Sequence, residues 1–169
     1  MNRPPRRPAA QGCSLPELLL ALAVLALLAA LSIGSGTETL ARQRLEVVAR
    51  RLEQGLNRAR AEAQRQGRAC GLSLQPEGWR APSAGSGLPA CFNDPQSLTE
   101  LVGGGAVQLR HNLPAPVRFS RNGLVLDGGT VVLSTAGTEL QRCLVMALPL
   151  GITRLGRYGA GGCLPDPAL

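Results

Sequence analysis

The 169-residue chain is poor in aromatic residues, lysine and histidine. Aromatic residues make up 2%, too few for the base-stacking surface of folds that bind RNA or single-stranded DNA. All 18 basic residues are arginine, which excludes enzymes that depend on a P-loop lysine or a lysine Schiff base. The single histidine, His111, leaves no room for a site with several histidine ligands, so we expect neither a metal nor a cofactor.

Charged residues are also scarce, at 17%, whereas apolar residues reach 44%. This balance predicts a folded chain with a core, and the length suits one domain of ordinary size. The candidate nucleophiles Ser134, Thr135 and Thr138 have no histidine partner, so no catalytic arrangement can be assembled. We predict that the protein is not an enzyme; a membrane-anchored hydrolase has no residues in its favour.

The N-terminus combines a basic leader with a long apolar run. Residues 1–12 contain Arg3, Arg6 and Arg7 and no acid, and residues 18–31 are all Leu, Ala or Val. As a helix, residues 15–33 would be about 28 Å long, close to the thickness of a bilayer's hydrocarbon core. We therefore predict a leader at 1–12 and a transmembrane helix at 13–33, with the C-terminus on the far side of the membrane.

Two other targeting signals are alternatives to this transmembrane helix. A secretory signal peptide, cut near Ala29-Ala30 or Ile33-Gly34, stays an alternative. A lipoprotein signal at Gly12-Cys13 fits less well, because the apolar run follows Cys13 instead of preceding it.

An acidic residue, Glu17, lies at the start of the apolar run, although a carboxylate inside a membrane costs up to about 3 kcal/mol. It belongs to the string Gln11-Gly12-Cys13-Ser14-Leu15-Pro16-Glu17-Leu18. This string resembles the type III signal of type IV pilins and type II secretion pseudopilins. The resemblance implies that a prepilin peptidase cuts after Gly12 and methylates Cys13, and that Glu17 pairs with the N-terminal amine of a neighbouring subunit. Cys13 departs from the bulky apolar residue usual at that position.

A second helical segment follows the apolar run. Gly34-Ser35-Gly36 is expected to interrupt the helix by a kink or local melting, because glycine costs about 1 kcal/mol in a helix. Helical patterning resumes from Thr37 to about Arg65, and Gly67 fits a C-terminal stop. Its apolar stripe consists of Leu45, Val48, Leu52, Leu56, Ala59 and Ala63. The opposite face carries Arg50, Arg51, Arg58, Arg60 and Glu62. We predict an amphipathic helix at 34–67.

The remaining residues, 68–169, predict an antiparallel β-sheet domain. Candidate strands are Ala69–Leu74, Ala106–Arg110, Val117–Ser120, Leu124–Leu126, Thr130–Ser134 and Cys143–Leu148. Asn122-Gly123 predicts a hairpin turn, and residues 82–89 predict a surface loop. The fold class is therefore α+β: a long N-terminal helix, half membrane-embedded and half amphipathic, packed on a β-sheet domain in a pilin-like arrangement.

The order of these segments resembles the GspH/FimT family of minor pseudopilins and minor pilins. The matching segments are the signal at 12–17, residues 40–46 and 57–63, Gly78-Trp79, residues 117–123 and Cys143-Leu144-Val145. The resemblance implies a non-enzymatic subunit of a type II secretion pseudopilus or a type IV pilus, placed near the filament tip. It also implies an anchor in the bacterial inner membrane, a periplasmic C-terminal domain, and prepilin peptidase and other pilin or pseudopilin subunits as partners.

Four of the five cysteines, Cys70, Cys91, Cys143 and Cys163, lie in the exported part. An even set outside the cytoplasm predicts disulfides, and three pairings are possible. We favour Cys143 with Cys163, which would tie the last strand to the C-terminal tail and leave Cys70 with Cys91. Buried free thiols are the alternative; a zinc site lacks the close C-x-x-C spacing.

DNA is an alternative partner. Without the leader the chain has 15 arginines and 11 acids, a formal charge of +4. Some proteins of the resembled family bind DNA during uptake in natural transformation, through a Gly-Arg-x-Arg motif. Here Gly151-Ile152-Thr153-Arg154 lacks the first arginine, and Gly156-Arg157-Tyr158-Gly159 is a partial substitute. Candidate phosphate contacts are Arg118, Arg121, Arg154 and Arg157; the other interpretation is arginines on a solvated face.

Overall fold

The computed structural model describes residues 14–98 and 106–166, without the side chains of residues 31–35. It separates into two compact units, residues 1–37 and residues 38–169. The candidate processing residues Gly12 and Cys13 lie outside the described part. We call residues 38–169 the head and describe each unit by itself.

A single helix, α1, extends from Leu15 to Gln66. It is continuous through Gly34-Ser35-Gly36, so the expectation of local melting there is wrong, whereas a kink stays a prediction. Breaking a long helix in its middle leaves backbone groups without partners, which opposes the cost of two glycines. Over the described residues, no helix combines the length and the hydropathy needed to cross a membrane. The membrane helix at 13–33 stays a prediction.

The part of α1 that belongs to the head packs into the core through the apolar stripe that the sequence predicts. All six stripe residues, from Leu45 to Ala63, are buried. Gly67 adopts φ +61° directly after the helix, and its N–H donates to the carbonyl of Gln64. This left-handed residue ends the helix, as predicted.

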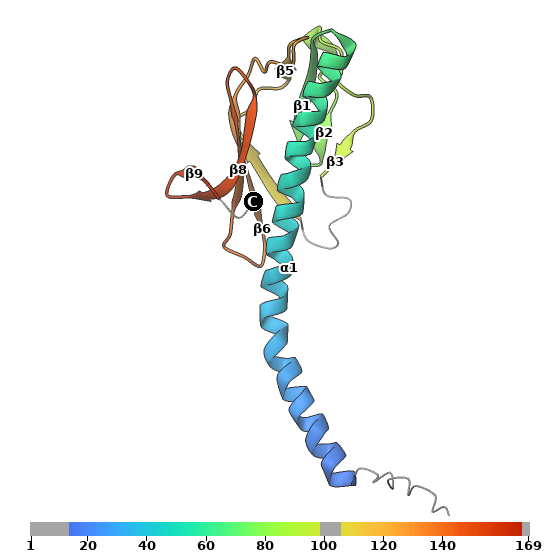
Figure 1. The fold of residues 1–169 in the computed structure, drawn as a ribbon, viewed down its shortest axis with the longest axis vertical. Coiled ribbons are helices and arrows are strands. Elements are labelled where there is room, and N and C mark those ends of the chain that lie inside the picture. The colour runs from blue at the N-terminus through green and yellow to red at the C-terminus, as the bar shows by residue number, and fades with distance from the viewer. Residues whose placement is uncertain (1–13, 99–105, 167–169) are drawn as a thin grey trace, which may run out of the picture. The chain divides into compact units, whose positions relative to one another are not determined.

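Two antiparallel sheets complete the head (Figure 1). The first has the order β3-β2-β1-β5, with β1 at Cys70–Gln75, β2 at Gly78–Arg80, β3 at Gln96–Ser97 and β5 at Val117–Phe119. The second has the order β4-β6-β7-β8-β9, with β4 at Val107–His111, β6 at Gly129–Thr135, β7 at Arg142–Ala147, β8 at Ile152–Gly159 and β9 at Gly162–Pro165. A short 3₁₀ helix, Ala84–Ser86, lies in the predicted 82–89 loop. The fold class is the predicted pilin-like α+β arrangement.

Some strands were not predicted, and one predicted strand is absent. The strands β2, β3, β8 and β9 are short or contain arginine, glycine and proline, so they lack the apolar run on which the prediction relied. The segment Leu124–Leu126 forms only an isolated bridge between Val125 and Phe119. The Asn122-Gly123 turn is present, with Gly123 at φ +74°, but its second strand is too short to form a hairpin.

Helix α1 and strand β2 approach each other closely at Gly55 and Trp79. Trp79 on β2 is fully buried, and its indole N–H donates to the carbonyl of Leu52 at 3.3 Å. A Cβ atom on Gly55 would lie 2.3 Å from Trp79 Cδ1, closer than any carbon contact allows. Glycine at position 55 therefore lets the indole ring lie directly against the helix backbone.

Candidate functional site

The start of α1 carries the only candidate assembly residue that the structure describes, Glu17. The carbonyl of Ser14 accepts the N–H groups of Glu17 at 3.0 Å and Leu18 at 3.2 Å, which begins the helix. Pro16 lies in the first turn, where its missing N–H removes no helix hydrogen bond. Glu17 is therefore held in the first turn, where the positive end of the helix dipole favours a carboxylate.

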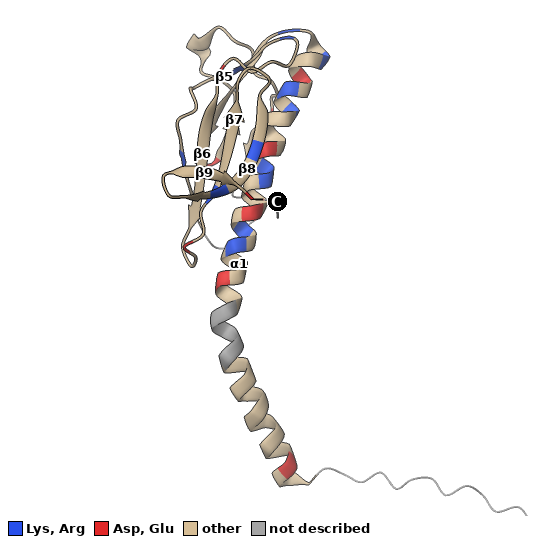
Figure 2. Cartoon of the chain, turned by 60° about the vertical axis from the view of Figure 1, so that its left-hand side comes forward, with Lys and Arg blue, Asp and Glu red and all other residues tan. Residues whose placement is uncertain are grey.

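The residues that follow Glu17 are apolar on every side of the helix. Nine large apolar side chains between positions 15 and 28 are each more than half exposed: Leu15, Leu18, Leu19, Leu20, Leu22, Val24, Leu25, Leu27 and Leu28. In Figure 2 this part of α1 carries no charge besides the acidic residue at its start, whereas both signs of charge follow along residues 38–66. A helix that is apolar all round requires burial in a membrane or among other helices.

The other half of α1 is fixed to both sheets by polar contacts. The guanidinium of Arg60 donates to the carbonyls of Leu150 and Gly151, in the turn before β8. Gln64 donates to the carbonyl of Asn122 at 3.1 Å, and Thr153 on β8 donates to Glu53 at 2.8 Å. These contacts place the turns around residues 122 and 150 at the end of the head where α1 ends.

Two disulfides cross-link segments of the head. Cys70, at the start of β1, is bonded to Cys91, and the adjoining backbone pairs Gly71 with Ala90. Cys143 on β7 is bonded to Cys163 on β9, which ties the last hairpin to the sheet. These are the two pairings that the sequence favoured. All four cysteines lie in the head, the part of the chain that the sequence predicts to be exported.

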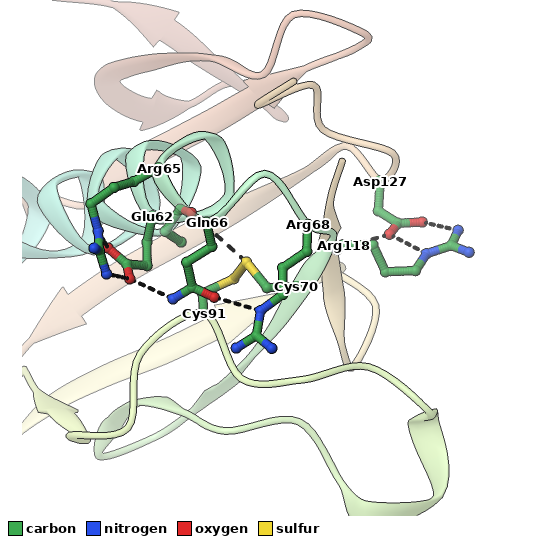
Figure 3. Close-up of a disulfide and its surroundings, with 9 residues drawn as sticks. Glu62, Arg65, Gln66, Arg68, Cys70, Cys91, Arg118 and Asp127 are labelled. Atoms are coloured by element: carbon green, nitrogen blue, oxygen red, sulfur yellow. Dashed lines mark hydrogen bonds and ion pairs between the residues drawn. A yellow bond between two sulfur atoms is a disulfide. The ribbon is translucent and has the colours of Figure 1, made fainter. Parts of the chain in front are cut away.

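A small charged cluster surrounds the first disulfide (Figure 3). Hydrogen bonds from Arg65 and Gln66 lower the pKa of Glu62 to about 2. On the neighbouring strand, the side chain of Arg118 donates two hydrogen bonds of 2.8 Å to Asp127. This pair lowers the pKa of Asp127 and raises that of Arg118. Two ion pairs, Glu62 with Arg65 and Asp127 with Arg118, therefore lie at this end of the head.

The four arginines proposed to contact DNA do not form one basic surface. Arg118 is paired with Asp127, which offsets its charge. Arg154 and Arg157 lie three residues apart on β8, where pairing with β7 is uninterrupted, so their side chains leave opposite faces of the sheet. Arg121 is exposed in the turn that follows β5, and β5 belongs to the other sheet. Only a partner that touches several faces could contact all four.

A comparison with protein families matches residues 48–149, more than half of the chain, to the family described as Type II transport protein GspH. The chain belongs to the GspH family. Comparisons with curated proteins and with solved structures found no match. As a member of this family it is a minor pseudopilin of type II secretion, a structural protein and not an enzyme, and it functions in pseudopilus assembly with other pseudopilins.

Within residues 14–98 and 106–166, no three His, Cys, Asp or Glu side chains lie close enough together to hold a metal ion. Two residues of this GspH-family head were missed as structural determinants. Arg60, which the sequence pattern places on the face opposite the apolar stripe, donates to backbone carbonyls in the turn before β8. Gly55 gave only a weak signal in the sequence, since a glycine inside a helical pattern is tolerated at a cost of about 1 kcal/mol relative to alanine.

Proposed function

We propose that this GspH-family protein is cut after Gly12, is held in the inner membrane by residues 13–33 with its head in the periplasm, and joins the pseudopilus near its tip. The observation that carries the proposal is the first half of α1, with apolar side chains exposed on all sides and one carboxylate in the first turn. The head needs none of these residues for its own core.

Burial drives the assembly step. Fully burying a leucine side chain is worth about 1.5–3 kcal/mol, so several exposed leucines favour packing of this segment among lipids and the helices of neighbouring subunits. The same burial disfavours Glu17 unless a positive charge is beside it. The amine that cleavage creates at Cys13 of a neighbouring subunit is such a charge, and this links processing to assembly.

Processing is tested by mass spectrometry of the protein isolated from cells that contain a prepilin peptidase. The mature N-terminus should be Cys13, and Gly12→Ala should leave an uncut precursor in the membrane. An intact Met1, or a cut near residue 34, would show that the prepilin interpretation is wrong.

The charge pair is tested by Glu17→Val, with Glu46→Val as the matched control. Glu46 lies on the same helix, but its carboxylate binds Arg50 at 2.7 Å on the surface of the head. We expect Glu17→Val to give a processed, membrane-bound protein that co-purifies poorly with other pseudopilins and supports little secretion. Glu46→Val should assemble normally. Equal assembly of the two variants would contradict a role for the Glu17 charge.

The position near the tip is tested by counting subunits. A tip subunit should be present in a few copies per pseudopilus, whatever the filament length. A copy number that rises in proportion to length would place the protein along the shaft instead.

A further inference from the structure

Strand β4 lies at one edge of its sheet. In the part of the chain that the structure describes, it pairs with β6 alone. The N–H of Asn112 donates to the carbonyl of Thr130 at 3.2 Å, so these two residues form a hydrogen-bonded pair. Hydrogen-bonded pairs alternate along an antiparallel ladder, and the N–H and C=O groups of Leu109 and His111 therefore point away from β6. Such a row of backbone groups can pair with a further strand.

A polar hollow of about 390 Å³ lies beside this edge. Its walls come from the end of β4, from β6 and from the β8–β9 hairpin, and none of its lining residues is acidic. They include Arg110, His111 and Tyr158, so the hollow offers a guanidinium, an imidazole and a phenol to a ligand. This chemistry favours a ligand with a carboxylate.

Arg110 points to the outer face of the sheet. It pairs with Val132 on β6, and residues that pair directly share one face. The neighbours of Val132, Val131 and Leu133, are buried in the core, so Val132 and Arg110 face away from it. Arg110 is exposed and forms no ion pair with any residue that the structure describes. Its charge is therefore not offset within this part of the chain.

One wall of the hollow is fixed covalently. Cys143 on β7 pairs with Val132 and is bonded to Cys163 on β9. Tyr158 lies opposite Cys163 in the β8–β9 hairpin. The disulfide thus holds this hairpin on the outer face, beside Arg110. A site of fixed shape lowers the entropy cost of binding.

We propose that the edge of β4 and this hollow bind an extended acidic peptide segment of a partner protein by strand addition. In this binding mode main-chain hydrogen bonds supply affinity, and pockets beside the edge select side chains. The residue opposite Arg110 on an added strand would have its Cβ atom about 5 Å from that of Arg110, so a carboxylate there would pair with the guanidinium.

Two other occupants fit this edge less well. A second copy of β4 would bring another Arg110 and no acid, because the segment 107–111 contains no acidic residue. Like charges that meet across two strands are destabilising. A nucleic acid would contact Arg110 but has no peptide backbone to pair with Leu109 and His111. The acidic peptide is the occupant that uses both the edge and the hollow.

Fluorescence anisotropy with the full-length protein in a zwitterionic detergent tests the ligand. The probe is a short labelled peptide in which threonine and glutamate alternate, and the control peptide has glutamine in place of each glutamate. We expect the glutamate peptide to bind at least about tenfold more tightly, because hydrogen bonds to charged groups are the stronger ones. Equal binding of the two peptides, or no binding of either at millimolar concentration, would overturn the proposal. Preferential binding of a short DNA duplex that depends on Arg110 would also overturn it.

Two matched pairs of variants locate the site. His111→Pro removes an outward N–H from β4, whereas His111→Ala removes the same imidazole and keeps that N–H. Arg110→Gln removes the charge beside the hollow, whereas Arg121→Gln removes an exposed arginine that follows β5 in the other sheet. We expect the first variant of each pair to bind the glutamate peptide about tenfold more weakly than its control. Equal affinities within either pair would contradict strand addition at this edge.

The folding of each variant is checked by its tryptophan fluorescence and by retention of both disulfides. If His111→Pro misfolds, the same hydrogen bonds are tested from the ligand: a glutamate peptide methylated at alternate backbone nitrogens should bind weakly to the unaltered protein. Unchanged affinity of the methylated peptide would overturn the proposal. These experiments concern the head alone, so their outcome is independent of processing at Gly12 and of the role of Glu17.

Discussion

The two halves of α1 have similar secondary structure and opposite surroundings. Residues 15–30 expose apolar side chains on every side, with Glu17 as their one charge. Residues 38–66 bury one stripe and expose ion pairs, such as Glu38 with Arg42 at 2.6 Å and Glu46 with Arg50 at 2.7 Å. The core of the head contains none of residues 15–30, whereas the stripe of the second half is part of that core together with residues of both sheets.

This difference separates folding from assembly. A substitution in residues 38–66 should change the free energy of unfolding of the head, because this half supplies one side of the core. A substitution in residues 15–30 should leave head stability unchanged and act only on insertion and filament formation.

Trp79→Ala should have the largest effect on stability. It removes the largest fully buried side chain and the hydrogen bond to Leu52, and truncations of this kind cost about 3–5 kcal/mol. Leu22→Ala, in the exposed half, should change head stability by close to zero. Chemical unfolding of both full-length variants in detergent, followed by circular dichroism, measures the difference. A similar loss of unfolding free energy in Leu22→Ala would show that residues 15–30 also stabilise the head.

Removal of the Cys70–Cys91 disulfide should rank second. The bond closes a loop with a sequence separation of 21, and loss of such a bond typically costs about 2–4 kcal/mol. The variant is Cys70→Ala with Cys91→Ala, and Cys13→Ala is the control, since residue 13 precedes the head. Unfolding monitored by the fluorescence of the single tryptophan reports both. An unchanged unfolding midpoint in the double variant would show that this disulfide does not stabilise the head.

Two Gly→Ala substitutions in the same helix should have opposite signs. At Gly36 a Cβ would meet nothing within 4 Å, so Gly36→Ala should favour the helix by up to about 1 kcal/mol. At Gly55 the Cβ would collide with the buried Trp79 ring, and Gly55→Ala should destabilise the head by about 1–3 kcal/mol. Helix content and tryptophan fluorescence during unfolding distinguish the two. Stabilisation by Gly55→Ala would refute the close packing of Trp79.

The smallest effect should come from acid titration of Glu62. Its pKa is lowered to about 2, so its ionised form stabilises the folded state above the ordinary carboxyl pKa of 4.5, and that contribution is lost as the pH falls toward 2. Glu62→Gln should therefore lower the melting temperature slightly at pH 7 and flatten its dependence between pH 5 and 2. Glu17→Gln, outside the head, should not change this profile. The comparison is made on thermal melts at several pH values.

Much of the fold could be predicted from local patterns in the sequence. The buried stripe from Leu45 to Ala63, the stop at Gly67 and the strands with apolar runs follow from the periods of helix and strand. The prediction failed where local signals were weak. Strand β8 contains two arginines and two glycines, and it forms because β7 and β9 pair with it on either side. Strand formation at such a segment is decided by its neighbours and not by its own residues.

The sequence by itself determined the class of the protein: the basic leader, the apolar run with Glu17, the amphipathic helix and the β-rich remainder occur in an order that local chemistry makes recognisable. Only the tertiary structure decided which groups meet. It placed Trp79 against Gly55, paired Arg118 with Asp127, turned Arg154 and Arg157 to opposite faces, and bound the backbone of Val125 to that of Pro149 in the turn before β8. The physical reason is that these contacts join residues far apart in the chain, whose proximity depends on packing and register and leaves no periodic signal in the sequence.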